Sequence, residues 1–147
     1  MADNAVDVAR ESIECFGAGD FDRMRSLLAD DSYEEEYSTQ RRLEGADAQV
    51  EAARGWKAAF PDGRGTVERA ISDGNTVALE LTWEGTQTGS MRAPDGQEMP
   101  ASNRRATVHA CQVMEIEDGK IKATHHYFDL MTILQQLGAM ERAGAAA

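Results

Sequence analysis

Residues 102–130, SNRRATVHACQVMEIEDGKIKATHHYFDL, form two long strand-like segments on either side of a tight turn. The Asp118-Gly119 dipeptide between them is a strong signal for a two-residue hairpin. Residues 65–72 and 76–88 alternate polar and apolar side chains around a second turn, Asp73-Gly74-Asn75. The four segments together predict an antiparallel meander in the second half of the chain.

Before this meander the apolar residues recur with a helical period. Residues 4–16, 21–29 and 46–60 are expected to form helices, with a short strand at 32–38 and a closing helix at 131–140. Helices gathered before long strands are typical of an α+β fold in which helices pack on one sheet face. We therefore expect a curved, mainly antiparallel sheet of four to six strands that encloses a pocket with these helices.

Length and charge restrict the classes of protein that the chain represents. The 147 residues suit a single domain, 1–147, with a flexible tail at 142–147. Because acidic residues exceed basic ones by 26 to 15, nucleic-acid binding is disfavoured, and neither an apolar span nor a polybasic helix indicates a membrane. The start lacks signal-peptide character and Cys15 and Cys111 are far apart, which predicts a cytoplasmic location.

Several short motifs follow one another in an order typical of a known family. They are Ala59-Phe60-Pro61-Asp62, Asp73-Gly74-Asn75-Thr76-Val77, Trp83-Glu84-Gly85-Thr86, Glu117-Asp118-Gly119-Lys120-Ile121, Tyr127-Phe128-Asp129 and Gln136-Leu137-Gly138. This set resembles the SnoaL-like polyketide cyclase family of the NTF2-like superfamily. The resemblance implies a cone-shaped fold with a pocket, a homodimer or homotetramer, and aldol ring closure of a polyketide ester without metal or cofactor. The family's acid/base Asp matches Asp129.

The register of the hairpin predicts which side chains face the pocket. A two-residue turn pairs Glu117 with Lys120, and continuing that register puts the more apolar face toward the core. A bulge would exchange the two faces beyond it. The expected pocket-facing residues of this hairpin are Val108, Gln112, Met114, His125, Tyr127 and Asp129.

Asp129 has two interpretations. In an apolar pocket the pKa of its carboxyl is raised, which suits a group that both takes and returns a proton. Alternatively, Asp129 precedes the closing helix and caps its first amides. Tyr127 either donates a hydrogen bond to a substrate oxygen or is a core aromatic residue, and for His125 we favour a structural role beside Gln112.

Other candidates come from outside the hairpin. Tyr33, Glu35 and Tyr37 share one face of the strand at 32–38, where Glu35 either shares a proton with Asp129 or belongs to an exposed acidic edge. Arg69 and Arg104 either bind a ligand oxygen or pair with nearby acids. The remaining predicted core or pocket-lining residues, which suit a flat aromatic ligand, are Trp56, Leu81 and Trp83.

Three functions remain open at this point. The first is a cofactor-independent cyclase of polyketide-like molecules, and the second is a small-molecule binding protein without turnover. The third is another NTF2-like enzyme, such as an isomerase, a hydroxylase-like relative or an epoxide hydrolase; the hydrolase needs Asp129, Glu35 and an arginine around one water. Three histidines without ligand spacing, and no HExxH or CxxC, argue against a metal site.

Overall fold

The structure is a computed structural model that describes residues 2–93 and 95–140. The predicted flexible tail at 142–147 lies outside the described residues. Within the described part, no helix has the length and apolar character needed to cross a membrane. The helices are α1 (Ala2–Ala18), α2 (Phe21–Leu27), α3 (Ala46–Ala59) and α4 (Leu130–Gln136), with a 3₁₀ turn at Tyr37–Thr39.

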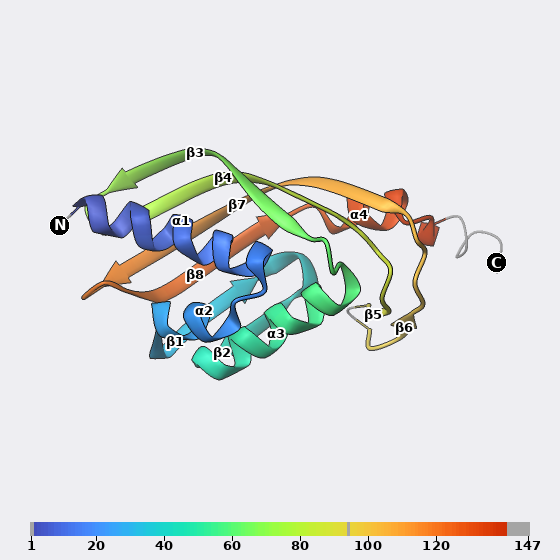
Figure 1. Ribbon diagram of the computed structural model, residues 1–147, viewed down its shortest axis with the longest axis horizontal. Coiled ribbons are helices and arrows are strands. Elements are labelled where there is room, and N and C mark those ends of the chain that lie inside the picture. Colours follow the sequence, from blue (N-terminus) through green and yellow to red (C-terminus); the bar gives the residue numbers. More distant parts are fainter. Residues whose placement is uncertain (1, 94, 141–147) are drawn as a thin grey trace.

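Six strands form one curved sheet in the order β2-β1-β8-β7-β4-β3 (Figure 1). Every neighbouring pair is antiparallel except β1 and β8, which run parallel. This confirms the predicted α+β class and the four-strand meander. The strands are β1 (Leu28–Glu36), β2 (Arg41–Glu44), β3 (Arg64–Asp73), β4 (Thr76–Thr86), β7 (Arg105–Glu117) and β8 (Lys120–Phe128), and a separate hairpin joins β5 (Met91–Arg92) to β6 (Glu98–Met99).

Helices α1, α2 and α3 cover the concave side of the sheet, and α4 lies at one end of it (Figure 1). Ala5, Ala9 and Ile13 of α1 are fully buried and belong to the same core as Leu79 and Leu81 of β4. Leu81 therefore packs in the core and does not line the cavity. Of its two predicted roles, the core role is correct and the pocket-lining role is not. Burial of each of the larger side chains, Ile13, Leu79 and Leu81, stabilises the fold by roughly 1.5–3 kcal/mol.

A bulge in β8 changes the register that the sequence predicts. Glu117 pairs with Lys120 and Ile116 with Ile121 as expected, but Glu115 then pairs with Ala123, so Lys122 is the additional residue. Because side chains alternate across a strand, one additional residue exchanges the faces beyond it. The concave face of β8 consequently carries Thr124, His126 and Phe128, whereas His125 and Tyr127 lie on the outer face.

Pairing with β8 also decides which side chains of the short strand β1 face the cavity. Glu34 and Glu36 pair in parallel register with Thr124 and His126 of β8, and residues paired in this way point to the same face. Glu34 and Glu36 therefore face the cavity, and Tyr33 and Glu35 face outward. The strand β2 was not expected, since its sequence, Arg41–Glu44, is short, charged and without apolar alternation.

Candidate functional site

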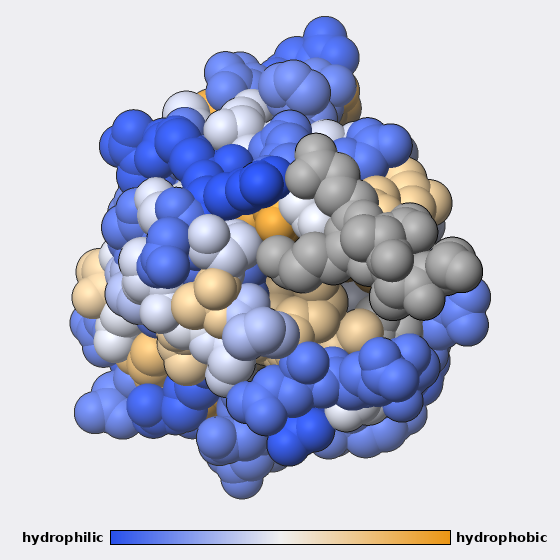
Figure 2. Space-filling view, turned by 90° about the vertical axis from the view of Figure 1, so that its right-hand side faces the viewer, coloured by the Kyte–Doolittle hydropathy of each residue, from blue (hydrophilic) through white to orange (hydrophobic). Residues whose placement is uncertain are grey.

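A cavity of about 160 Å³ lies between the concave sheet face and the helices. A dry cavity of about 150 Å³ is known to hold a benzene molecule, so this one has room for a single small ring. At the end of the molecule with α4 and the β5–β6 hairpin, Figure 2 shows hydrophobic surface at the bottom of a recess among hydrophilic residues. The aromatic residues that line the cavity are Phe16, Trp56, Phe60, Trp83 and Phe128.

These rings contact one another in a nearly continuous series. The ring centroids of Trp56 and Phe128 lie 5.9 Å apart, and those of Phe128 and His126 lie 4.8 Å apart. Trp83 lies 6.0 Å from His126 and 5.3 Å from Phe16. Centroid separations of 4.5–7 Å are those of favourable aromatic pairs, so the walls of the cavity hold each other in place.

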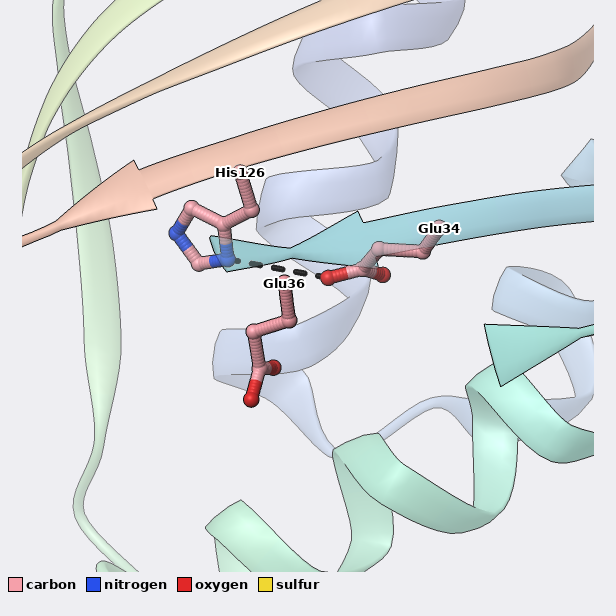
Figure 3. Close-up of side chains that lie close together, drawn as sticks. All are labelled: Glu34, Glu36 and His126. Carbon is pink, nitrogen blue, oxygen red and sulfur yellow. Dashed lines mark ion pairs between the residues drawn. The ribbon is translucent and has the colours of Figure 1, made fainter. Parts of the chain in front are cut away.

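Three polar side chains converge on this aromatic surface: Glu34, Glu36 and His126 (Figure 3). Nδ1 of His126 lies 3.6 Å from Oε2 of Glu34. The side chains are largely buried, with exposed fractions of 19% for Glu34, 10% for His126 and 3% for Glu36. Glu34 accepts no hydrogen bond from any described residue, so its carboxylate is open to a ligand except on the side of His126.

Trp83 determines the tautomer of His126. Its indole N–H, which is only a donor, lies 3.1 Å from Nε2 of His126. Nε2 must therefore accept, so the ring is neutral and carries its proton on Nδ1, the nitrogen that faces Glu34. His126 is thus arranged to donate toward the Glu34 carboxylate.

Glu36 differs from Glu34 because its oxygens are already occupied. Oε1 accepts hydrogen bonds from Thr39 Oγ1 at 2.5 Å and from Arg41 Nε at 2.9 Å. Oε2 accepts from the indole N–H of Trp56 at 3.2 Å. These bonds attach the end of β1 to α3 and to β2, which gives Glu36 a structural role at the site.

The ligand atoms of Glu34, Glu36 and His126 lie within 4.8 Å of one another, close enough for a metal ion. Two of these groups do not fit that role as arranged. Coordination through Nδ1 would move the ring proton to Nε2, where it would oppose the Trp83 N–H, and Glu36 already accepts three hydrogen bonds. The arrangement fits proton transfer better than metal binding.

Two further polar side chains line the cavity without a partner. Gln112 on β7 is 8% exposed and Thr124 on β8 is 4% exposed. Neither side chain makes a hydrogen bond with any residue in the described part of the chain. No fully buried side-chain nitrogen or oxygen of the described residues lacks a partner, so the polar atoms of Gln112 and Thr124 keep contact with the cavity space and are available to a bound molecule.

Of the residues predicted to face the pocket, the structure places five in the cavity wall. One comes from the helical stripe of α3, and the others come from β4 and β7, which pair with each other without a bulge. These residues are Trp56, Trp83, Val108, Gln112 and Met114.

The expectation that Asp129 is buried, with a raised pKa, was wrong. Asp129 is exposed, lies outside the cavity-lining residues and caps α4. Hydrogen bonds from the Thr132 hydroxyl at 2.8 Å and the Thr132 amide at 3.2 Å lower its pKa. The alternative interpretation as a helix cap describes its position, and its catalytic role stays a prediction that this position does not support.

Tyr33, Tyr37, His125 and Tyr127 form a cluster on the outer face instead of lining the pocket. The Tyr37 hydroxyl lies 2.7 Å from His125 Nδ1, and the Tyr37 and Tyr127 rings stack with centroids 4.8 Å apart. Glu35 shares this face and pairs with Arg42 at 2.5 Å. The predicted placement of these five residues in the pocket was therefore wrong, because the bulge in β8 and the matching face of β1 turn them outward.

The two arginines also lie outside the cavity wall. Arg69 pairs with Glu80 at 2.7 Å on exposed positions of β3 and β4, as the alternative interpretation expected. Arg104 is exposed and its guanidinium lies beside Gly138 after α4. Neither is positioned to bind an oxygen of a ligand in the cavity.

Sequence reasoning missed Glu34, Glu36 and His126. A bulge in the hairpin exchanges its two faces, as expected for any bulge, and this exchange turns His126 toward the cavity. No feature of the sequence locates that bulge at Lys122, since the turn itself and the first two pairs follow the regular register.

Comparisons with known proteins agree with this architecture. No curated protein matches the chain. Among solved structures, TsrD from Streptomyces laurentii has a TM-score of 0.80 at 22% identity, covering 95% of this chain and 98% of that one. A Jannaschia sp. CCS1 protein, provisionally assigned as a SnoaL-like polyketide cyclase, has a TM-score of 0.83 at 18% identity, covering 94% of each chain.

An LEH-like epoxide hydrolase of M. tuberculosis has a TM-score of 0.72 at 20% identity, covering 99% of this chain and 97% of that one. At these identities the likeness concerns the fold alone, which hosts more than one chemistry. The family model of SnoaL-like polyketide cyclases matches residues 6–137. Because this match covers nearly the whole described fold, the chain belongs to the SnoaL-like polyketide cyclase family.

Proposed function

We propose that the protein is a cofactor-independent acid/base enzyme that removes a proton from carbon next to a carbonyl group. Its proposed substrate class is a flat, polyketide-like molecule, and its proposed reaction is the intramolecular aldol closure of a polyketide ester. The observation that carries the proposal is the Glu34 carboxylate, which lines an aromatic cavity with His126 as its only polar partner among described residues.

Glu34 is the proposed base. Its oxygens accept no hydrogen bond from the described residues, and its carboxylate faces a cavity sized for a ring. A general base must lie within hydrogen-bond reach of the proton that it removes, and Glu34 lines the same cavity as Trp56 and Phe128, against which a ring would bind. Removing the base from such a site lowers the rate by roughly 10²–10⁴-fold.

His126 is the proposed positioning residue. Its Nδ1–H points toward Glu34, and the hydrogen bond from Trp83 keeps that proton on Nδ1. At 3.6 Å the two groups are not hydrogen-bonded, and a small approach of the side chains on substrate binding would let the Nδ1–H orient the carboxylate.

The proposed aldol step needs one proton, which Glu34 first removes and later returns. Glu34 takes a proton from the carbon acid, and the resulting enolate carbon forms a bond to a second carbonyl carbon of the same molecule. That carbonyl becomes an alkoxide, which takes the proton back from Glu34. The Gln112 amide and the Thr124 hydroxyl are placed in the cavity wall to donate hydrogen bonds to the oxygen that gains charge.

The epoxide hydrolase alternative required Asp129, Glu35 and an arginine around one water. Neither carboxylate lines the cavity, and neither do the two candidate arginines, Arg69 and Arg104. Glu35 and Arg69 each pair with another residue on the outer face. A homo-oligomer and a cytoplasmic location stay proposals. The outer-face residues Tyr37 and Tyr127, 44% and 48% exposed, are candidates for an oligomer interface.

The direct test uses acetophenone, a flat aromatic ketone of a size suited to the cavity. Deuterium exchange at its methyl group reports proton removal next to a carbonyl and is followed by NMR in D₂O. We expect the protein to accelerate exchange over buffer, and substitution of Phe128 by Ala at the cavity wall to weaken ketone binding. Exchange at the buffer rate, with the ketone bound, contradicts the proposed chemistry and leaves a binding protein.

A further inference from the structure

We propose that the cavity binds an organic cation, a molecule with a protonated amine or quaternary ammonium group on an apolar body. This names the substrate class of the proposed active site and rests on that site being the functional cavity, but it does not depend on turnover. Four observations carry it: the charge at Glu34, the aromatic surface beside it, two unpartnered polar groups, and the absence of an uncompensated cation in the described cavity wall.

Glu34 is the cavity carboxylate without a cationic partner among the described residues. Glu36 is compensated by Arg41 at 2.9 Å, and Glu84 is compensated by Arg64 at 2.6 Å. Two described side chains have polar atoms within 4.8 Å of the Glu34 carboxylate. One is the His126 ring, which is neutral because Nε2 accepts from Trp83, and the other is the Glu36 carboxylate, whose charge Arg41 already offsets. A largely buried carboxylate is unfavourable unless it is paired, so a cationic ligand supplies the partner that the protein does not.

The surface beside Glu34 is suited to a cation with alkyl groups. The Trp56, Phe128 and Trp83 rings line the cavity. Phe128 and Trp83 lie 4.8 and 6.0 Å from the His126 ring, and Trp56 lies 5.9 Å from Phe128. A cation within about 6 Å of such ring faces is attracted by their quadrupoles, most strongly for tryptophan and in desolvated sites. Aromatic faces next to a carboxylate are the usual environment in which proteins hold ammonium groups.

Gln112 and Thr124 independently point to a ligand. Both line the cavity, both are more than nine-tenths buried, and neither has a hydrogen-bond partner in the described chain. The amide oxygen and the hydroxyl oxygen accept hydrogen bonds from an N–H group, and the amide N–H also donates to a carbonyl or hydroxyl of the same ligand. An apolar hydrocarbon would leave both groups unsatisfied.

An anionic ligand does not suit the cavity. Among the described lining residues Arg64 is the one cationic side chain, and it is engaged with Glu84. A carboxylate or phosphate group would lie near Glu34 without a free cation to offset it.

The test compares choline with 3,3-dimethylbutan-1-ol, which has the same shape and a carbon atom in place of the charged nitrogen. Binding to the full-length, ¹⁵N-labelled protein is followed through the indole N–H signals. The chain has two tryptophans, Trp56 and Trp83, and both line the cavity. We expect saturable shifts with choline at concentrations at least about tenfold lower than with the neutral alcohol.

The variant Glu34→Gln is expected to remove this preference. Glu35→Gln, which makes the same charge change one residue away on the outer face, is expected to keep it. Absence of binding by choline, or equal binding of the two probes to the unaltered protein, overturns the proposal whether or not Glu34→Gln folds. Choline binding without acetophenone exchange would contradict the proposed chemistry alone, and exchange without a preference for choline would contradict the cation proposal alone.

Discussion

The indole N–H of Trp83 donates to Nε2 of His126 at 3.1 Å, so the proton of the imidazole lies on Nδ1, facing Glu34. Trp83 stands on β4 and His126 on β8, with β7 between them. The geometry of the acid/base pair therefore depends on a residue two strands away. Residues that hold a reacting pair in one tautomer often matter nearly as much as the pair itself.

Replacing Trp83 by Phe is expected to change the tautomer of His126. The ring keeps its aromatic contact but loses the N–H donor, and Nε2 is then free to carry the proton. Imidazole ¹⁵N shifts measure the protonated nitrogen directly. Nδ1 protonation in the parent protein and a substantial Nε2-protonated population in Trp83→Phe are expected, whereas identical spectra would contradict the role given to Trp83.

Glu36 is expected to be structural, in contrast to Glu34. Glu36→Gln places an amide N–H₂ against at least one of the three donors that now bind the carboxylate, Thr39, Arg41 and Trp56. We expect the free energy of unfolding to fall by about 1–3 kcal/mol. Denaturant unfolding measures this, with Glu35→Gln as the control, for which the partly exposed pair with Arg42 predicts a much smaller loss.

Gly65 on β3 is expected to be intolerant of a side chain. A Cβ there would lie 2.7 Å from Cζ3 of Trp83 and 2.8 Å from Cγ2 of Ile13. Gly65→Ala should therefore lower the free energy of unfolding by about 1–3 kcal/mol and displace the Trp83 indole signal. Gly55→Ala in α3, where nothing lies within 4 Å, should instead stabilise the protein by roughly 0.5–1 kcal/mol.

Asp129 is expected to act on stability through the cap of α4. Asn caps a helix as well as Asp does, so Asp129→Asn should leave the melting temperature at neutral pH nearly unchanged, while Asp129→Ala should lower it by a few degrees. The Thr132 hydrogen bonds lower the folded pKa of Asp129 below its ordinary value of 3.8. Its contribution is therefore present above that value and lost as the pH falls through the folded pKa.

Melting curves at neutral and acid pH test whether the stability contributed by Asp129 is lost on acidification. The acid loss attributable to Asp129 should be absent in Asp129→Asn, because the amide does not titrate. A gain of stability in the parent protein relative to Asp129→Asn on acidification would contradict the assignment.

The sequence predicted the fold better than the site, for physical reasons. Alternation and turn residues are local signals, so the meander and the positions of Trp83, Val108 and Met114 were correct. The faces of β8 beyond Lys122 depend on a bulge, and one additional residue exchanged His125 for His126 and Tyr127 for Phe128. A bulge arises from strand pairing in three dimensions and leaves no comparable local signal.

Glu34 and Glu36 illustrate a second limit. In isolation a run of three acidic residues predicts an exposed edge, and that interpretation holds for none of them, because β1 lies inside the sheet between β2 and β8. Glu35 faces outward, yet its side chain is only 25% exposed beside Arg42. Pairing with β8 on one side and β2 on the other buries the remaining two, and the donors that compensate Glu36 come from Thr39, Arg41 and the distant Trp56. Such burial of charge is decided by long-range contacts.

The central claim, that Glu34 and not Asp129 moves the proton, is tested most directly by comparing two carboxamide variants. Acetophenone exchange is measured for Glu34→Gln and Asp129→Asn under conditions in which both are folded. The account predicts a loss of about 10²–10⁴-fold in the catalysed rate, limited by the buffer rate, for Glu34→Gln and no loss for Asp129→Asn. Full exchange activity in Glu34→Gln together with its loss in Asp129→Asn would contradict the account.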